Sequence, residues 1–318
     1  MEVPPEFLLK LAPALPRVKQ GLGWHIATPG GTGMKFGASM FITDYSMGPG
    51  EIAQALEQRG FDSLWAPEHS HIPVSRRSVF PNGGEVPKHY YDVMDPFVTL
   101  SAAAMVTTTL KLGTGVCLVN QRDPIQLAQS VASLDRISNG RFIFGIGVGW
   151  NADEMENHGT VFATRAKLVR ERVEAMKAIW TQTKAEYHGE FVNFDPMMAW
   201  PKPVQKPYPP IYVGGAFPHA ARRAIRYADG WMPLAGLMGE NSDVFSIVPK
   251  ARAMLAAEGR DPSTFPISLT ASPEDLDLLK RYRDLGIERA SVSLPAGNAE
   301  TVLPILDRWA TLIRQVSN

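Results

Sequence analysis

A histidine and a glutamate stand together where an apolar segment of the chain ends. Trp65-Ala66-Pro67 leads directly into Glu68-His69. An imidazole exchanges a proton near neutral pH, and an adjacent carboxylate can hold one of its tautomers. The pair therefore indicates general acid–base chemistry, with His69 as proton donor or acceptor and Glu68 as its orienting partner. The alternative is a solvated loop histidine.

Metal binding and Schiff-base chemistry are two further alternatives for this region. His69-Ser70-His71 has metal-ligand spacing, because both rings lie on one side of an extended backbone. A metallohydrolase would need more ligands at later strand ends, where the sequence has Gly214-Gly215, Trp231 and Ser293. A Schiff-base aldolase needs a lysine in the C-terminal half of a strand, and the predicted strands carry lysine at their entrances. Both alternatives are disfavoured, and no metal is expected.

Glycines follow two other apolar segments. Phe142 to Val148 is too short for a helix and lacks alternation, so it predicts a strand buried on both faces. It ends at Gly147-Val148-Gly149, where missing side chains would let another molecule lie against the backbone; tight packing is the alternative. Gly214-Gly215-Ala216 precedes a predicted helix over 218–227, whose free N–H groups could hold a phosphate. A plain strand-to-helix turn is the alternative there.

The first of these glycine runs also fits a dinucleotide fingerprint, Gly147-x-Gly149-x-x-Ala152. That fingerprint needs an acidic residue at the end of the next strand, about 20 residues further on. Arg170-Glu171-Arg172 stands there, within a helical pattern. A Rossmann site is therefore disfavoured.

The elements that would position these residues alternate regularly from Lys35 onward. Apolar segments typical of strands are separated by amphipathic segments typical of helices. Asp123-Pro124 supplies an N-cap and a first-turn proline for one helix. Ser272-Pro273-Glu274-Asp275 repeats that pattern before a helix over 276–285, which Gly286 ends. Strands are predicted at 35–42, 62–66, 111–118, 141–148, 210–214, 230–234, 266–270 and 289–294.

Eight such alternations in about 280 residues, without an internal break in composition, predict an α/β fold: one closed (β/α)8 barrel. The C-terminal strand ends would then meet on one face and carry the chemistry. These ends have little charge, several glycines and large apolar side chains, which suits a flat, bulky, partly anionic cofactor. They are Met40-Phe41, Glu68-His69, Val116-Cys117, Gly147 to Asn151, Gly214-Gly215-Ala216 and Trp231.

Three segments depart from the alternation. Residues 1–33 are rich in proline and glycine, and they predict an N-terminal extension to a catalytic domain over 34–318. Residues 72–94 predict a wall or lid over the site. Tyr187 to Phe194 predicts a small hairpin beside the barrel.

Composition excludes several classes of protein. The chain is 45% hydrophobic and 20% charged, as ordinary globular proteins are. Its formal net charge of +0 gives no argument for nucleic acid or an anionic membrane as partner. The single cysteine, Cys117, excludes an internal disulfide framework and reads as a small buried residue near the pocket. No apolar run approaches the roughly 18 residues that cross a membrane, so a cytoplasmic protein is expected.

Four motifs in register resemble the luciferase-like monooxygenase superfamily, most closely its actinobacterial branch that depends on the deazaflavin coenzyme F420. The match runs from about Lys35 to Ile313, and the motifs are Trp65 to His69, Leu112 to Val116, Leu134 to Asn151 and Ile211 to Gly215. The resemblance implies a TIM barrel with the deazaflavin at the C-terminal strand ends. In relatives a non-prolyl cis peptide bulges toward its ring, and the matching bond is Gly115–Val116.

The resemblance also implies roles for individual residues. His69 matches the acid–base histidine of the sugar-phosphate dehydrogenase of this group, and Glu68 matches its neighbouring aspartate. Where that dehydrogenase has a catalytic glutamate, this chain has Trp150, so we expect a substrate that is uncharged near the reacting centre. The cofactor-binding residues are expected to be Phe41, Gly115, Val116, Cys117, Gly147, Val148, Gly149, Trp150, Asn151, Gly214, Gly215 and Ala216.

The expected activity is reversible hydride transfer between C5 of the deazaflavin and a small organic substrate. His69 would carry the proton, and Glu68 would orient it. The alternatives are an FMN-dependent monooxygenase, supplied with reduced flavin by a partner reductase, and a non-catalytic barrel that binds a cofactor. The resemblance further implies a homodimer paired through helices. The polyglutamate tail of F420 would be held by Arg76, Arg77, Lys202 or none of them, since loop cations are most often only solvated.

Overall fold

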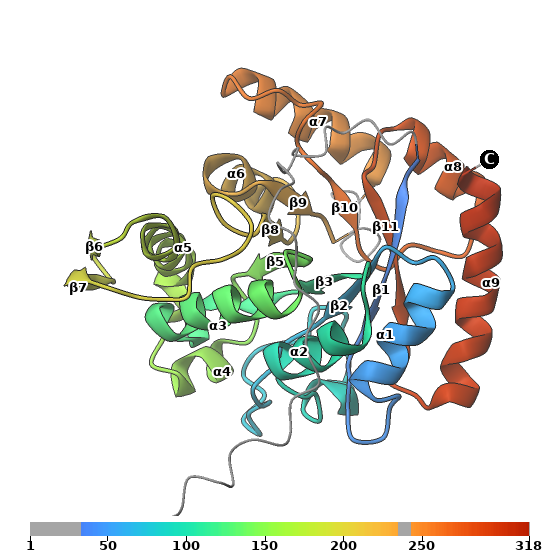
Figure 1. The fold of residues 1–318 in the computed structure, drawn as a ribbon, viewed down its shortest axis with the longest axis horizontal. Coiled ribbons are helices and arrows are strands. Elements are labelled where there is room, and N and C mark those ends of the chain that lie inside the picture. The colour runs from blue at the N-terminus through green and yellow to red at the C-terminus, as the bar shows by residue number, and fades with distance from the viewer. Residues whose placement is uncertain (1–32, 235–242, 318) are drawn as a thin grey trace, which may run out of the picture. The chain divides into compact units, whose positions relative to one another are not determined.

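The computed structural model describes residues 33–234 and 243–317. The predicted extension over 1–33 therefore lies outside the described residues, except for Gly33, and the division into an extension and a catalytic domain stays a prediction. In the described part, parallel strands alternate with helices that cover them on the outside (Figure 1).

The parallel strands form one sheet that closes on itself. Its strands are β1 (Lys35–Met40), β2 (Ser63–Ala66), β3 (Lys111–Thr114), β4 (Cys117–Leu118), β5 (Phe142–Gly147), β8 (Ile211–Gly214), β9 (Gly230–Met232), β10 (Ser268–Leu269) and β11 (Arg289–Leu294). Their order is β10-β11-β1-β2-β3-β5-β8-β9, with β4 also paired to β5. A parallel bridge between Trp231 and Ile267 joins the two ends. The predicted barrel is thus confirmed.

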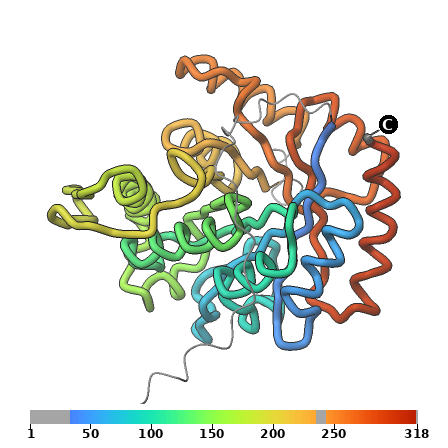
Figure 2. The backbone as a smooth tube through the Cα atoms, in the orientation of Figure 1, coloured from blue at the N-terminus to red at the C-terminus, as the bar shows by residue number. Residues whose placement is uncertain are grey.

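Helices follow the strands along the chain, as the backbone trace shows (Figure 2). They are α1 (Pro49–Gln58), α2 (Pro96–Val106), α3 (Pro124–Ile137), α4 (Ala152–Asn157), α5 (Arg165–Thr181), α6 (His219–Tyr227), α7 (Val244–Ala257), α8 (Leu276–Asp284) and α9 (Ala299–Ser317). The predicted hairpin is present as the antiparallel pair β6 (Ala185–His188) and β7 (Asn193–Met197). Within the described ranges, no helix is long and apolar enough to cross a membrane.

The helix caps follow the sequence signals in one case and depart from them in another. Asp123 caps α3, because its Oδ1 accepts hydrogen bonds from Ile125 N and Gln126 N at 3.0 and 2.9 Å. Helix α8 begins at Leu276, as predicted, but its cap is Asp275 and not Ser272. Ser272 N donates instead to Ser291 O of β11 at 2.8 Å. That bond holds Ser272 against the sheet, so Asp275 takes the cap position instead.

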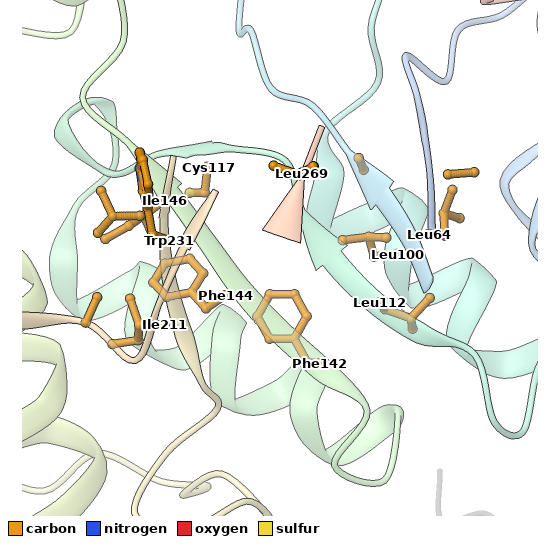
Figure 3. Close-up of a cluster of buried hydrophobic side chains, with 14 of the residues drawn as sticks. Leu64, Leu100, Leu112, Cys117, Phe142, Phe144, Ile146, Ile211, Trp231 and Leu269 are labelled. Carbon is orange, nitrogen blue, oxygen red and sulfur yellow. The ribbon is translucent and has the colours of Figure 1, made fainter. Parts of the chain in front are cut away.

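The strands are buried on both faces, as their continuous apolar runs predict. Phe142, Phe144 and Ile146 lie in a large cluster with residues of the covering helices, such as Leu100 (Figure 3). Ile143, between the two phenylalanines, belongs to a separate cluster with Trp65, Tyr212 and Met232. Successive side chains of a strand point to opposite faces, so this second cluster fills the barrel interior.

Glu57 joins the end of α1 to the segment before β3. One of its oxygens accepts hydrogen bonds from the backbone N–H groups of Thr108, Thr109 and Leu110 at 2.9, 2.6 and 2.9 Å, and from the Thr109 hydroxyl at 2.8 Å. Burial alone would raise the pKa of Glu57, but these donors favour the carboxylate and lower the pKa from 4.5 to about 2. The stabilisation is therefore complete above pH 4.5 and is lost as the pH falls toward 2.

We expect Glu57→Gln to lower the free energy of unfolding by about 1–2 kcal/mol at pH 7, because the site is partly solvated and the amide keeps some bonds. The difference from the wild type should shrink at about pH 3, where the wild-type carboxylate begins to lose its advantage. Urea unfolding at the two pH values measures this, with the exposed Glu51→Gln of the same helix as control. A deficit that is equal at both pH values would contradict the assignment.

Helix α2 exposes large apolar side chains on its outer face. Val98 and Met105 are 69% and 74% exposed. Helix pairing is compatible with such a face, and the homodimer stays a prediction.

Candidate functional site

A cavity of about 560 Å³ opens where the C-terminal ends of the strands meet. Its size and mixed lining are those of a small-molecule or cofactor site. The structure brings most of the predicted site residues to its wall: Phe41, Glu68, His69, Gly115, Val116, Gly147, Val148, Gly149, Trp150, Gly214, Gly215 and Ala216.

Two predicted cofactor-binding residues do not line this cavity. Cys117 is fully buried and points into the apolar cluster outside the barrel strands (Figure 3). Its neighbour Val116 faces the cavity, and alternation sends the next side chain to the other face. Burial raises the pKa of the Cys117 thiol well above its usual value, so the thiol stays protonated. Asn151 caps α4 instead, with its side-chain oxygen 3.4 Å from Glu154 N.

The cis peptide bond implied by the resemblance is present between Gly115 and Val116. It divides the predicted strand over 111–118 into β3 and β4. A Cβ atom on Gly147 or Gly214 would lie 2.5 or 2.6 Å from a methyl group of Val116. Gly147 was expected to leave bare backbone for a ligand, but the Val116 side chain occupies the space over it and over Gly214. The two glycines act on the site by holding Val116 in the cavity wall.

His69 pairs with a carboxylate that the sequence did not point to. Its Nδ1 lies 2.8 Å from Oε2 of Glu154 in α4, and the two side chains are 8% and 0% exposed. Ser70 N donates to the other oxygen of Glu154 at 3.0 Å.

The charge of Glu154 sets the tautomer of His69. Burial acts to raise the pKa of Glu154, but the hydrogen bond and charge of His69 and the N–H of Ser70 outweigh it and lower the pKa. Glu154 is therefore a carboxylate at neutral pH, so we assign the proton to Nδ1 of His69. Nε2 is then left for a ligand in the cavity.

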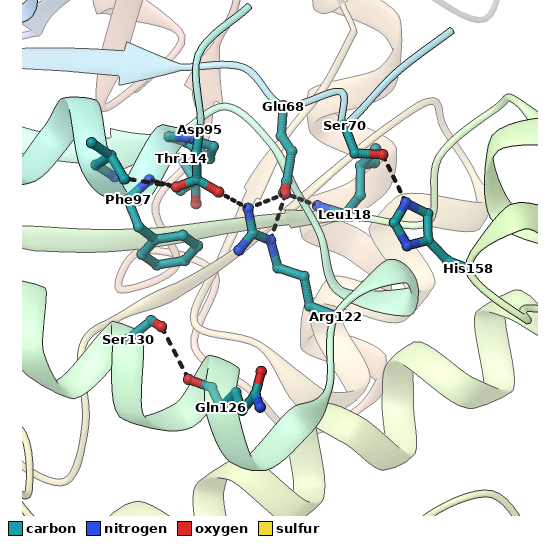
Figure 4. Close-up of polar contacts among 12 residues, drawn as sticks. Glu68, Ser70, Asp95, Phe97, Thr114, Leu118, Arg122, Gln126, Ser130 and His158 are labelled. Carbon is teal, nitrogen blue, oxygen red and sulfur yellow. Dashed lines mark hydrogen bonds and ion pairs between the residues drawn. The ribbon is translucent and has the colours of Figure 1, made fainter. Parts of the chain in front are cut away.

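Glu68 points away from His69, which corrects the expected pair. Its Oε2 accepts a hydrogen bond from Leu118 N at 2.7 Å, and its Oε1 binds Arg122, which also binds Asp95 (Figure 4). Successive residues on an extended backbone direct their side chains to opposite sides. The orienting position therefore falls to Glu154, 85 residues further along the chain.

The neighbouring histidine does not join His69 at the cavity. The His71 ring lies against Ser70, with Nδ1 2.8 Å from the hydroxyl, and its Nε2 accepts from Asn157 at 2.8 Å. The same hydroxyl lies 2.7 Å from Nε2 of His158 (Figure 4). In the part of the chain that the structure describes, no three potential ligands come close enough to hold a metal.

Two arginines that the sequence reasoning missed also line the cavity: Arg165, the first residue of α5, and Arg223 in α6. Their Nε atoms are buried without an acceptor. The described residues place no carboxylate against either guanidinium, and Arg165 Nη1 donates only to the carbonyl of Phe162, at 2.7 Å. Arg165 begins α5 and Arg223 lies in the second turn of α6, and a place near the start of a helix that follows a C-terminal strand end is the signal that could have found them.

The charges of Arg165 and Arg223 stay unneutralised inside the protein. Burial lowers the pKa of Arg223, and burial together with the charge of Arg223 lowers the pKa of Arg165. Arg223 lies beside Gly215, where a Cβ atom would be 3.8 Å from its Nη2. Two guanidinium groups without a carboxylate partner among the described residues, one of them beside Gly215, are suited to bind an anion. We call Arg165, Arg223 and Gly215 the anion site.

The cations considered for the cofactor tail do not line the cavity. Lys202 is buried, and its ammonium donates to the carbonyls of Ile179 and Gln182. Arg77 pairs with Asp153 and Glu156, and Arg76 turns back to the carbonyls of its own loop. Lys202 is therefore not available to a ligand.

Comparison with known proteins gives one family match and several relatives. Residues 49–273 match the model of the family described as luciferase-like monooxygenase. An uncharacterized protein of Mycobacterium tuberculosis is 38% identical over 281 residues, which cover 87% of this chain and 98% of the relative. The F420-dependent hydroxymycolic acid dehydrogenase of the same species is 28% identical over 237 residues, covering 74% of this chain and 60% of that protein. The crystal structure of the monooxygenase RslO1 from Streptomyces bottropensis superposes with a TM-score of 0.71 at 22% identity, covering 87% and 98% of the two chains.

Proposed function

The chain belongs to the luciferase-like monooxygenase family, a family of oxidoreductases, and on that premise we propose that it transfers a hydride between coenzyme F420 and a small uncharged organic substrate. The observation that carries the proposal is one cavity that holds both a proton-transfer pair, His69–Glu154, and an unneutralised anion site. The relative named as an F420-dependent dehydrogenase supports the choice of a deazaflavin.

The residues present fit a phosphorylated deazaflavin. The buried Nε–H groups of Arg165 and Arg223 lack an acceptor, which a phosphate would supply. Val116 and Gly149, which line the cavity, would border the flat ring system. When bound, the deazaflavin supplies a carbon that accepts or gives a hydride.

The chain's own residues handle the proton and the surroundings of the reaction. In the oxidation of an alcohol, the O–H proton passes to Nε2 of His69 while the C–H bond gives up its hydride, and a C=O bond forms. Glu154 stabilises the imidazolium through Nδ1–H. Trp150 packs against His69, and Phe80 packs against Trp150; both line the cavity and would exclude water from the reacting atoms.

The test is a parallel titration of the purified protein with F420 and with FMN, followed by fluorescence. We expect a dissociation constant for F420 in the micromolar range and FMN binding at least about tenfold weaker. A preference for FMN would favour a two-component monooxygenase. Binding of neither would refute the cofactor assignment.

Arg223→Gln should weaken F420 binding by about 10- to 100-fold, because a charge-assisted bond to phosphate contributes about 1.5–3 kcal/mol. Titration with F420 and with the same deazaflavin lacking its phosphate and tail measures this. The phosphate-free form should bind the variant as well as the wild type, and Arg222→Gln, exposed on the same helix, serves as the matched control. An equal loss for both forms would show that Arg223 acts on the fold and not on the phosphate.

A further inference from the structure

Aromatic side chains form a continuous wall next to the proton-transfer pair. We call Phe80, Tyr90 and Trp150 the aromatic wall. The ring centre of Tyr90 lies 5.2 Å from that of His69 and 5.2 Å from that of Phe80. Trp150 lies 5.7 Å from Phe80 and 5.8 Å from His69. All four rings line the cavity, so a molecule whose polar atom reaches His69 also meets the wall.

Polar contacts with α4 fix the loop that carries most of this wall. Phe80 and Tyr90 come from the segment between β2 and α2. Asp153 accepts hydrogen bonds from the Ser75 hydroxyl at 2.7 Å and from Arg77 N at 2.9 Å. Ala152 N donates to the Ser78 hydroxyl at 2.8 Å. These bonds anchor the loop next to Phe80 and so hold the wall in place, which lowers the entropy cost of binding.

The wall carries no free charge. Burial raises the pKa of Tyr90 and lowers that of the adjacent His89, so both stay neutral at pH 7. Both oxygens of Glu68 are occupied by Arg122 and Leu118. In the anion site, Gly215 follows β8, and β3 and β5 separate β8 from β2, the strand that Phe80 and Tyr90 follow. A charged group on the substrate would therefore lose its water at the wall without gaining a partner.

We propose that the substrate is a ring-bearing, uncharged secondary alcohol or its ketone, with an aromatic or alicyclic ring on the carbon that reacts. A ring lying on the wall buries its apolar face and gains ring–ring contact, while the neighbouring oxygen reaches Nε2 of His69. The choice of reaction rests on the proposed function; the ring site rests on the wall alone.

The first test compares three ketones in the reduction driven by reduced F420: acetone, acetophenone and 4-acetylbenzoate. They share one reacting group and differ in the ring and in one charge. We expect kcat/KM for acetophenone to exceed that for acetone by about 10- to 100-fold. The value for 4-acetylbenzoate should fall at least about tenfold below that for acetophenone. A rate for acetone or 4-acetylbenzoate equal to that for acetophenone would overturn the proposal.

The second test measures acetophenone binding directly, by calorimetry on the protein without cofactor. Phe80→Ala should weaken this binding about tenfold, and it should lower the ratio of the acetophenone and acetone rates. Val79→Ala is the matched control, because Val79 is 82% exposed and should change neither quantity. Undiminished binding in Phe80→Ala would refute the ring site even if F420 binds and turns over. If the wild-type protein does not bind F420 but binds acetophenone, and Phe80→Ala weakens that binding, the proposed function is refuted and the ring site is not.

Discussion

Replacing His69 by glutamine is expected to lower kcat by about 10²- to 10⁴-fold while the dissociation constant of F420 changes less than about threefold. Glutamine keeps a polar side chain of similar length in the wall but cannot carry a proton. The substrate oxygen would then have to exchange its proton with water, which the aromatic wall excludes. Rates at saturating cofactor and a fluorescence titration of the same preparation measure the two effects separately.

The neighbouring His71→Gln is the control for this experiment. His71 does not line the cavity and contacts Ser70 and Asn157, so turnover should stay near the wild-type value. A His69→Gln variant that retains most of its rate would remove His69 from the chemistry. Loss of cofactor binding in the variant would show a structural role. A wild-type protein that binds F420 and turns over none of the ketones would favour the non-catalytic barrel.

The fold could be predicted because the local sequence patterns agree with which residues are buried in the structure. A strand buried on both faces reads as an unbroken apolar run, and Phe142 to Val148 is such a run. Asp123-Pro124 gives a helix start that depends on neighbouring residues only. The cap of α8 could not be predicted, because a distant strand holds Ser272 through Ser291 O.

The site could be predicted only as far as it depends on which residues follow each strand. In a parallel barrel every C-terminal strand end reaches one face, which is enough to bring His69, Gly147 and Gly214 together. The direction in which a side chain points within that face depends on its hydrogen-bond partners and on the local backbone conformation. Cys117 turns outward after the cis bond between Gly115 and Val116.

Side-chain pairs between residues far apart in the chain could not be predicted from the sequence. Glu68 is adjacent to His69 in the chain and was therefore taken as its partner, whereas the partner in space is Glu154 from a six-residue helix. Nothing in the local sequence separates Glu154 from the exposed Glu156 two residues later. The sequence gives a clearer indication of Arg165 and Arg223, because each lies in the first two turns of a helix that follows a C-terminal strand end.

Glu154→Gln is expected to lower kcat by about 100-fold or more while leaving F420 bound. The amide keeps the volume but loses the charge, and its NH₂ group can donate to Nδ1, which stabilises the wrong tautomer of His69. Removing the negative charge also disfavours the protonated imidazole, so the pH–rate profile should move to lower pH. Retained F420 affinity shows that the variant is folded.

Glu68→Gln separates this assignment from the pairing that the sequence suggested. This substitution should lower the stability of the protein, because Glu68 anchors Arg122 and Leu118 N. It should leave the pH–rate profile unchanged. The two variants should therefore differ in what they change. Glu68→Gln should lower the melting temperature, and Glu154→Gln should shift the pH dependence of kcat. If Glu68→Gln shifts the profile and Glu154→Gln does not, the partner of His69 during turnover is Glu68. The loop after β2 would then have to rearrange when substrate binds.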